Sequence, residues 1–189
     1  MRVFARAAPT PSGRCRAMLL SNSLPRGLSI AGLIIFLDQL SKYWVVERIM
    51  RPEGVDGTPF YSATRIELLP FFDVVMAWNR GVSFGIGNNG GEWNALILSA
   101  LAMVICAGMT FWLAKAETFL VQVALGGIIG GALGNVIDRA RFGAVADFLD
   151  LHVAGYHWPA FNVADSAITV GAVFLVVDSL FAGRDSSKN

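Results

Sequence analysis

Charged residues are scarce in this chain, and their scarcity excludes most classes of soluble protein. Only 15% of the 189 residues are Asp, Glu, Lys or Arg, whereas 54% are hydrophobic. Because a soluble domain carries about 25% charged residues, the composition indicates an integral membrane protein. The formal net charge of +1 leaves no excess of positive charge for nucleic acid, so no nucleic-acid partner is expected.

Cysteine is also scarce, and the chain lacks the usual spacing of metal ligands. Cys15 lies in a basic segment and Cys106 in an apolar run, so we expect no disulfide between them. Asp150, His152 and His157 share one connection, but no Cys/His spacing there gives the usual pattern of a zinc site. We therefore expect neither a metal nor another cofactor.

The chain does have four long apolar stretches, each long enough to cross a bilayer. A hydrocarbon layer of about 30 Å requires about 20 apolar residues in a helix. The two middle stretches contain no charged residue at all. The predicted spans are residues 28–46, 95–113, 119–137 and 160–180.

The charges outside the spans predict the orientation. Residues 1–26 contain five arginines and no acid, which favours the cytoplasmic side of an inner membrane. Four spans return the chain to that side, so residues 184–189 are expected to be cytoplasmic and the segments 48–92 and 138–159 to lie outside. Residues 1–26 lack the apolar core of a cleavable signal peptide, so the first span should remain as an anchor, and Met18 is an alternative first residue.

The outer segment 48–92 is too apolar to be disordered. Its part 66–78 resembles a strand interrupted by Pro70, and a stretch rich in glycine and asparagine follows at 79–91. We therefore expect a short sheet on the membrane surface. The predicted fold is an all-α membrane protein, a four-transmembrane-helix bundle in residues 27–183 with a small extracytoplasmic β-rich subdomain.

The third predicted span has a face without side chains. Its glycines form overlapping Gly-xxx-Gly pairs, which allow a neighbouring helix to approach closely. They are Gly126, Gly127, Gly130, Gly131 and Gly134. We interpret this pattern as helix packing rather than chemistry.

Polar side chains gather at the predicted outer face. Asn135 and Arg139 are four residues apart at the end of the third span, and Asn162 and Asp165 are three apart at the start of the fourth. Each pair shares a helix face. Asp147 lies in the connection between these spans. Two carboxylates that meet are the minimum for hydrolysis by an activated water, so this group is the candidate site.

Each of these residues also has a simpler structural explanation. In that interpretation Arg139 reaches lipid head groups, Asn162 caps the fourth helix, and Asp165 interacts with the positive end of that helix's dipole. Their coincidence at one face favours a site over three separate explanations. Asp38 and Lys42 form a second cluster, for which we expect a buried ion pair that orients the bundle.

Five motifs occur in the order known from one family. The chain resembles the lipoprotein signal peptidases, or signal peptidase II, over about residues 28–182. The resemblance implies an aspartic peptidase of the bacterial inner membrane that removes signal peptides from diacylglyceryl-modified prolipoproteins, on the N-terminal side of the lipidated cysteine. The motifs are DQLSK (38–42), NRGVSFG (79–85), GGALGNVIDR (130–139), VADFLD (145–150) and FNVADS (161–166).

The resemblance also implies roles for individual residues. Its catalytic pair falls on Asp147 and Asp165, although the sequence does not show which is the acid and which the base. It implies a four-helix bundle with an outer β-cradle, a site at the extracytoplasmic face, membrane lipids around the bundle and no cofactor, and we expect a monomer. The supporting polar residues correspond to Asp38, Lys42, Asn79, Gly81, Asn135, Arg139 and Asn162.

Two other functions are alternatives to a peptidase for a chain with this pattern of residues. An ion or proton carrier would use Asp38, Lys42 and Asp165 as a relay, but it calls for acids distributed across the membrane depth, and here they gather at one face. An assembly factor would rely on the Gly-xxx-Gly packing and would tolerate Asp→Asn changes at Asp147 and Asp165. A peptidase would not.

Overall fold

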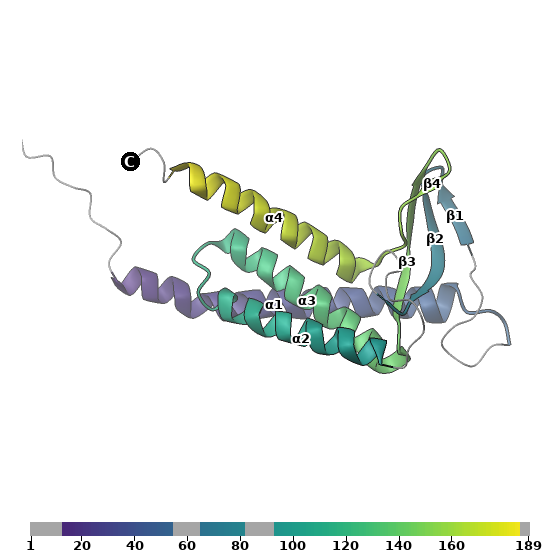
Figure 1. Ribbon diagram of the computed structural model, residues 1–189, viewed down its shortest axis with the longest axis horizontal. Coiled ribbons are helices and arrows are strands. Elements are labelled where there is room, and N and C mark those ends of the chain that lie inside the picture. The colour runs from purple at the N-terminus through teal and green to yellow at the C-terminus, as the bar shows by residue number, and fades with distance from the viewer. Residues whose placement is uncertain (1–12, 55–64, 82–92, 186–189) are drawn as a thin grey trace, which may run out of the picture.

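The computed structural model describes residues 13–54, 65–81 and 93–185, which form a helical bundle with a sheet at one end (Figure 1). The helices are α1 (Gly13–Trp44), α2 (Asn94–Leu113), α3 (Phe119–Phe142) and α4 (Val163–Asp185). A π-helical turn, η1 (Val45–Ile49), continues α1. The strands are β1 (Arg65–Leu69), β2 (Phe72–Asn79), β3 (Val145–Val153) and β4 (Tyr156–His157).

Each predicted span coincides with a helix that is long and apolar enough to cross a membrane. The helix α1 starts well before the predicted span, so residues 13–26 are helical and include Pro25 rather than forming a separate tail. The helix α4 starts at Val163 rather than at residue 160, because Asn162 caps it. Residues 1–12 of the predicted tail and most of the glycine-rich stretch, 82–92, lie outside the described residues.

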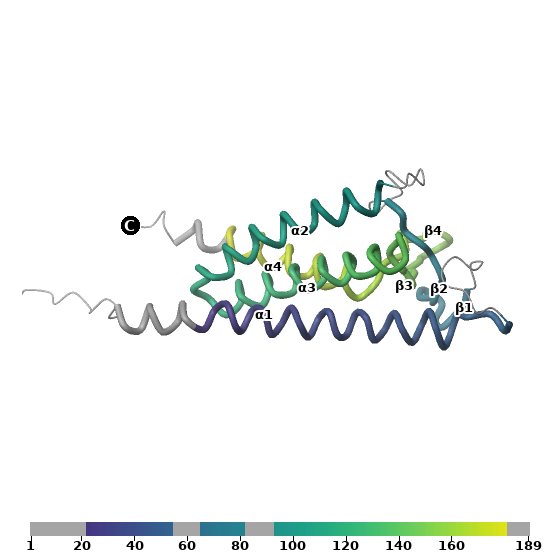
Figure 2. The backbone as a smooth tube through the Cα atoms, turned by 90° about the horizontal axis from the view of Figure 1, so that it is seen from below, coloured from purple at the N-terminus to yellow at the C-terminus, as the bar shows by residue number. Residues whose placement is uncertain are grey.

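The helix α3 is the centre of the bundle. It contacts α1, α2 and α4, and Figure 2 shows it between α1 and α2. Its most apolar window is 67% buried, against 11% for the windows of α2 and α4. The outward side chains of those two helices are apolar, for example Val104, Phe111 and Val173, as expected of helices that face lipid.

The glycines of α3 allow this close packing, as the sequence predicted. A Cβ atom on Gly130 would lie 2.6 Å from the carbonyl oxygen of Ala31 in α1. A Cβ atom on Gly131 would collide with the carbonyl oxygen of Ala164 in α4. Two neighbouring helices therefore approach the backbone of α3 on two of its sides.

The sheet lies beside the C-terminal part of α1 and beyond the N-terminal end of α4 (Figure 1). Its strand order is β1-β2-β3-β4, and neighbouring strands are antiparallel. The predicted strand region 66–78 forms β1 and β2, which turn at Pro70. The segment 138–159, for which only a position outside the membrane was predicted, supplies the end of α3 and the strands β3 and β4.

A second core joins the sheet to the bundle. Val45, Val46 and Met50, at the end of the first span, pack against Ala146 and Phe148 of β3. Gly143, two residues before β3 begins, ends α3 with φ of 71°, a left-handed conformation that glycine adopts without strain. The chain then enters β3 directly. These contacts fix the position of Asp147, which lies in the same strand.

Candidate active site

The two candidate aspartates come from different elements at the sheet end of the bundle. Asp147 lies in β3, where it is paired with Ala77 of β2 and is 3% exposed. Asp165 lies in the first turn of α4 and is partly buried. Because β3 follows α3 and α4 follows the sheet, the chain brings both carboxylates to the same end of α3.

Asp165 and Asn162 together form the cap of α4. The Asp165 backbone N–H donates to Asn162 Oδ1 at 2.9 Å, and the Asn162 backbone N–H donates to Asp165 Oδ2 at 3.3 Å. This reciprocal pair is a capping box, so the helix end itself fixes the Asp165 side chain. Ser166 donates its hydroxyl to the Asn162 carbonyl oxygen and belongs to the same cap.

Two amide side chains connect the carboxylates. The Asn162 Nδ2 donates to Asp147 Oδ1 at 2.7 Å, and the Asn135 Nδ2 donates to Asp165 Oδ1 at 2.8 Å. The two amides also meet, because Asn162 Nδ2 is 3.2 Å from Asn135 Oδ1. Asn135 reaches α4 because Gly131, one turn earlier in α3, lets the two helices come close.

Asp147 holds its proton to an unusually high pH. Burial is the main cause and the negative charge of Asp165 is the second, and together they raise the pKa of Asp147 from 3.8 to about 7. Hydrogen bonds from Asn79 and Asn162 and the charge of Lys42 act in the opposite direction. Two neighbouring carboxyl groups of this kind share one proton near neutral pH.

A buried lysine supports the strand and the helix that carry the aspartates. The Lys42 Nζ lies 2.8 Å from Asp38 Oδ2 and 2.7 Å from Asp138 Oδ2, and all three side chains are at most 4% exposed. The predicted Asp38–Lys42 pair is therefore present. Asp138 is a third member, which the sequence reasoning missed although it lies three residues after Asn135 on the same face of α3.

Each of these two buried aspartates accepts a backbone hydrogen bond beside a candidate catalytic residue. The Ala146 N–H, just before Asp147, donates to Asp138 Oδ2 at 3.2 Å. The Ala164 N–H, just before Asp165, donates to Asp38 Oδ1 at 3.0 Å. The ion cluster therefore holds the backbone on both sides of the site.

The remaining predicted site residues connect β2 to α3. The Arg139 guanidinium donates to the Gly81 carbonyl oxygen at 3.2 Å, and the Gly81 N–H donates to Asn79 Oδ1 at 3.1 Å. Asn79 also hydrogen-bonds to the Asp147 side chain. A hollow beside α2 is lined by Asn79, Asn135, Arg139 and Asp165 among others. All nine predicted site residues therefore belong to one connected region.

One group of potential metal ligands lies outside this region. Asp150, His152 and His157 come within 4.8 Å of one another through their ligand atoms. Asp150 and Asp147 are three residues apart in β3, so their side chains leave opposite faces of the strand. The candidate site itself offers two carboxylates, which suit proton transfer to and from water, and amides that hold them in place.

Four apolar helices with two amide-linked carboxylates at one end of the bundle are typical of a membrane-embedded aspartic hydrolase, and comparison with known proteins places the chain more closely. Residues 30–181 match the family model for signal peptidase (SPase) II. A lipoprotein signal peptidase of Methylorubrum extorquens (strain PA1) is 44% identical, over 76% of this chain and 79% of that protein. One of Paraburkholderia phytofirmans (strain DSM 17436 / LMG 22146 / PsJN) is 38% identical, over 98% of each.

The solved structures agree with this placement. A bacterial membrane enzyme superposes with a TM-score of 0.69 at 26% identity, over 86% of this chain and 90% of that one. The chain belongs to the lipoprotein signal peptidase (signal peptidase II) family and is an aspartic peptidase.

Proposed function

We propose that Asp147 and Asp165 hydrolyse the peptide bond on the N-terminal side of a diacylglyceryl-modified cysteine in prolipoproteins. The observation that carries this proposal is the pair of carboxylates joined through Asn162 and Asn135, with the pKa of Asp147 raised to about 7. Such a pair offers one acid and one base at the same pH. The family membership supports the reaction, and the geometry supports the roles of the residues.

The proposed acid is Asp147 and the proposed base is Asp165. Asp147 keeps its proton up to about pH 7, whereas Asp165 accepts two N–H donors at a helix N-terminus, which favours negative charge. Asp165 takes a proton from water, the water oxygen bonds to the scissile carbonyl carbon, and Asp147 gives its proton to the carbonyl oxygen. When the C–N bond breaks, Asp165 passes its proton to the amine. Asp147 recovers a proton from the hydroxyl group, which restores the starting state.

The surrounding residues orient this pair. Asn135 and Asn162 hold one oxygen of each carboxylate in place, and Lys42 with Asp38 fixes the start of α4. The Arg139–Gly81 contact forms one wall, where the backbone can approach an extended peptide. Removing any one of these side chains should lower kcat more than it weakens substrate binding.

Apolar hollows on two sides of Asp165 suit a substrate that stays in the membrane. One lies between α2 and α3 and includes Leu98, Leu101 and Ile105. The other, about 400 Å³, follows α4 and includes Trp158 and Val170. We propose that the lipid and the signal peptide approach laterally through these hollows, so that their apolar parts remain in hydrocarbon while the scissile bond reaches the carboxylates.

We further propose that the sheet and the site face the extracytoplasmic side of the bacterial inner membrane. The first residues of α1, which include Arg14 and Arg16, and the last residues of α4 lie at the end opposite to the sheet (Figure 1). We treat residues 27–183 as one monomeric membrane domain, which the helical residues 13–26 extend toward the cytoplasm.

A cleavage assay with a purified diacylglyceryl-modified prolipoprotein tests the function and the pair together. Wild type should release the signal peptide, whereas Asp147→Asn and Asp165→Asn should each lose at least about 1,000-fold in kcat, as expected when one member of a concerted pair is removed. Glu67→Gln, an exposed carboxylate on β1, is the matched control and should keep full activity. Cleavage should also decline as the pH rises above about 7, because Asp147 then loses its proton.

The outcomes separate the proposals. Full cleavage by a folded Asp147→Asn or Asp165→Asn variant would eliminate the two-carboxylate mechanism. Cleavage only of substrates without the lipid would eliminate the proposed substrate class but not the chemistry. Size-exclusion chromatography in detergent is the control for folding. A variant that elutes as wild type does has lost cleavage for a reason other than misfolding.

A further inference from the structure

A second polar cluster lies on the face of the sheet opposite to Asp147. Asp150 and His152 are two residues apart in β3 and therefore share that face. The strand register pairs Asp150 with Asp73 of β2, and His152 with His157 of β4. Paired residues on antiparallel strands present their side chains on the same face. Three strands thus bring two carboxylates and two imidazoles together.

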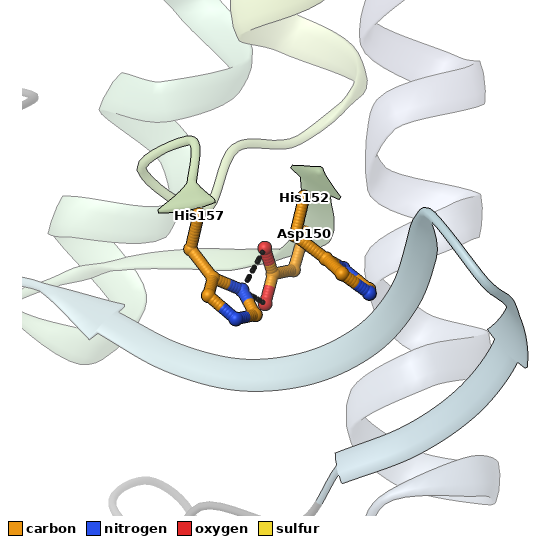
Figure 3. A group of neighbouring side chains, drawn as sticks. All are labelled: Asp150, His152 and His157. Carbon is orange, nitrogen blue, oxygen red and sulfur yellow. Dashed lines mark hydrogen bonds and ion pairs between the residues drawn. The ribbon is translucent and has the colours of Figure 1, made fainter. Parts of the chain in front are cut away.

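The side chains converge more closely than a shared face alone requires. His157 Nδ1 lies 2.8 Å from Asp150 Oδ2, and the His152 and His157 rings stack with centroids 4.7 Å apart. Figure 3 shows the His157 ring turned toward the Asp150 carboxylate. One ligand atom from each of Asp150, His152 and His157 lies within 4.8 Å of the others. Ligand atoms of a tetrahedral zinc site are about 3.4 Å apart, so small rotamer changes would close the group.

Buried polar atoms without a hydrogen-bond partner in the cluster are potential ligands for a cation. Among the described residues, His152 Nδ1 is buried without a hydrogen-bond partner, and its nearest carboxylate oxygen, Asp73 Oδ2, is 3.7 Å away. Asp73 is only 2% exposed, and its Oδ1 also has no partner among them. A buried carboxylate oxygen or imidazole nitrogen without a partner is costly, and both are ligands that a borderline divalent cation prefers.

Arg65 now supplies the positive charge for the two carboxylates. Its guanidinium lies 3.0 Å from Asp150 Oδ2 and 3.4 Å from Asp73 Oδ2. Its side chain is 47% exposed, however, so it can withdraw into water at little cost. Once the arginine has left, the negative charges of the two carboxylates would neutralise the charge of a divalent cation, and the imidazoles would bind it as neutral ligands. Arg65 therefore competes with a metal cation for the two carboxylates, but it does not prevent the cation from binding them.

We propose that Asp150, His152 and His157, with Asp73 beside them, form a binding site for a divalent transition-metal ion of the zinc type. This site is separate from the candidate peptidase site and does not depend on the proposed function. Its occupation would tie the two-residue strand β4 to β3 and β2. Residues 158–162 connect β4 to the cap of α4, so the ion would stabilise the segment that leads to Asn162.

Calorimetric titration of Zn²⁺ tests the site directly. The full chain, without a histidine tag and with Cys15→Ser and Cys106→Ser to remove its thiols, is titrated in detergent after treatment with a chelator. We expect one zinc per chain and a higher Tm when zinc is bound. His152→Ala and His157→Ala should each lose this binding. Arg65→Gln should bind up to about fivefold more tightly, because an exposed ion pair worth about 1 kcal/mol no longer competes.

Variants of the candidate peptidase site serve as controls. Asp147→Asn and Asp165→Asn should bind zinc as the parent does, because their carboxylates lie outside the cluster. Absence of zinc binding in the folded parent chain would overturn the proposal. Zinc binding by both histidine variants with the same affinity as the parent would also overturn it. If His152→Ala does not fold, His157→Ala decides, since this side chain is 37% exposed and its loss disturbs the sheet less.

Discussion

At the scale of single residues, the raised pKa that suits Asp147 to its proposed role as an acid also has a cost in stability. Its folded pKa of about 7 exceeds the ordinary value of 3.8 because the carboxyl is buried and faces Asp165. Between these pH values the unfolded chain releases a proton that the folded protein keeps. The folded state therefore loses stability as the pH rises from about 4 to about 7, and no further above that.

Asp147→Asn should remove this pH dependence. The variant has no carboxyl at position 147, so its Tm should fall less than that of wild type between pH 5 and pH 8. At pH 8 the variant should be the more stable protein. Thermal unfolding in detergent at both pH values measures the difference, with Glu67→Gln as an exposed control that follows wild type. Parallel curves for wild type and Asp147→Asn would contradict the raised pKa.

Lys42 is the residue on which the buried ion cluster depends. Lys42→Met leaves Asp38 and Asp138 buried without their cation, so the free energy of unfolding should drop by about 3–5 kcal/mol. The exposed Lys115→Met loses only a cation–π contact with Phe111 and should change it by less than about 1 kcal/mol. Chemical unfolding in mixed detergent measures both variants.

A compensated variant separates charge from shape in this cluster. Adding Asp38→Asn and Asp138→Asn to Lys42→Met removes the uncompensated charges, and it should recover part of the lost stability. No recovery would mean that Lys42 acts mainly through packing. The recovered protein should still cleave poorly, because the amides hold the Ala146 and Ala164 N–H groups less strongly than carboxylates.

At the scale of elements, the glycines of α3 determine how closely the helices approach. Gly130→Ala places a Cβ atom 2.6 Å from a backbone oxygen of α1, which cannot yield locally. We expect a loss of about 1–3 kcal/mol. The matched control is Gly108→Ala in α2, where a Cβ atom meets nothing within 4 Å and should be neutral or stabilising. Equal Tm changes for the two variants in detergent would refute the packing argument.

The elements also show how far the sequence alone could predict the fold. The four helices follow from length and lack of charge, and β1 and β2 follow from an apolar run interrupted by Pro70. The strand β3 was not predicted, although its segment VADFLDLHV is largely apolar, because it pairs with β2, which lies far away in the sequence. A strand of that kind is stabilised by its neighbours rather than by its own residues.

The same distinction applies to the candidate site. Spacing on a helix predicted that Asn135, Arg139, Asn162 and Asp165 would gather at one face. It could not predict that Asn135 reaches Asp165 across two helices, which depends on the close approach at Gly131. Nor did it reveal Asp138, whose partner Lys42 comes from another span. The periodicity of a helix predicts which residues share one of its faces. Which residues of different elements touch follows only from how the elements pack.

At the scale of the whole molecule, the bundle separates two ends with different roles. The sheet, which carries Asp147 and the proposed zinc cluster, and the first turn of α4, which carries Asp165, lie at one end, and the connection between α2 and α3 lies at the other (Figure 1). If the basic N-terminal segment stays in the cytoplasm, every residue of the sheet faces the extracytoplasmic side. The proposed orientation therefore predicts on which side of the membrane each exposed residue of the two ends lies.

Cysteine labelling of intact cells should resolve this orientation. In a chain with Cys15→Ser and Cys106→Ser, Tyr156→Cys places a thiol at a side chain that is 74% exposed at the sheet end. Lys115→Cys places one at the exposed connection between α2 and α3. A thiol reagent that enters the periplasm but cannot cross the inner membrane should label the first variant only, and lysed cells should show both. Labelling of Lys115→Cys alone in intact cells would invert the topology, and the carboxylates would then face the cytoplasm, where no exported prolipoprotein could reach them.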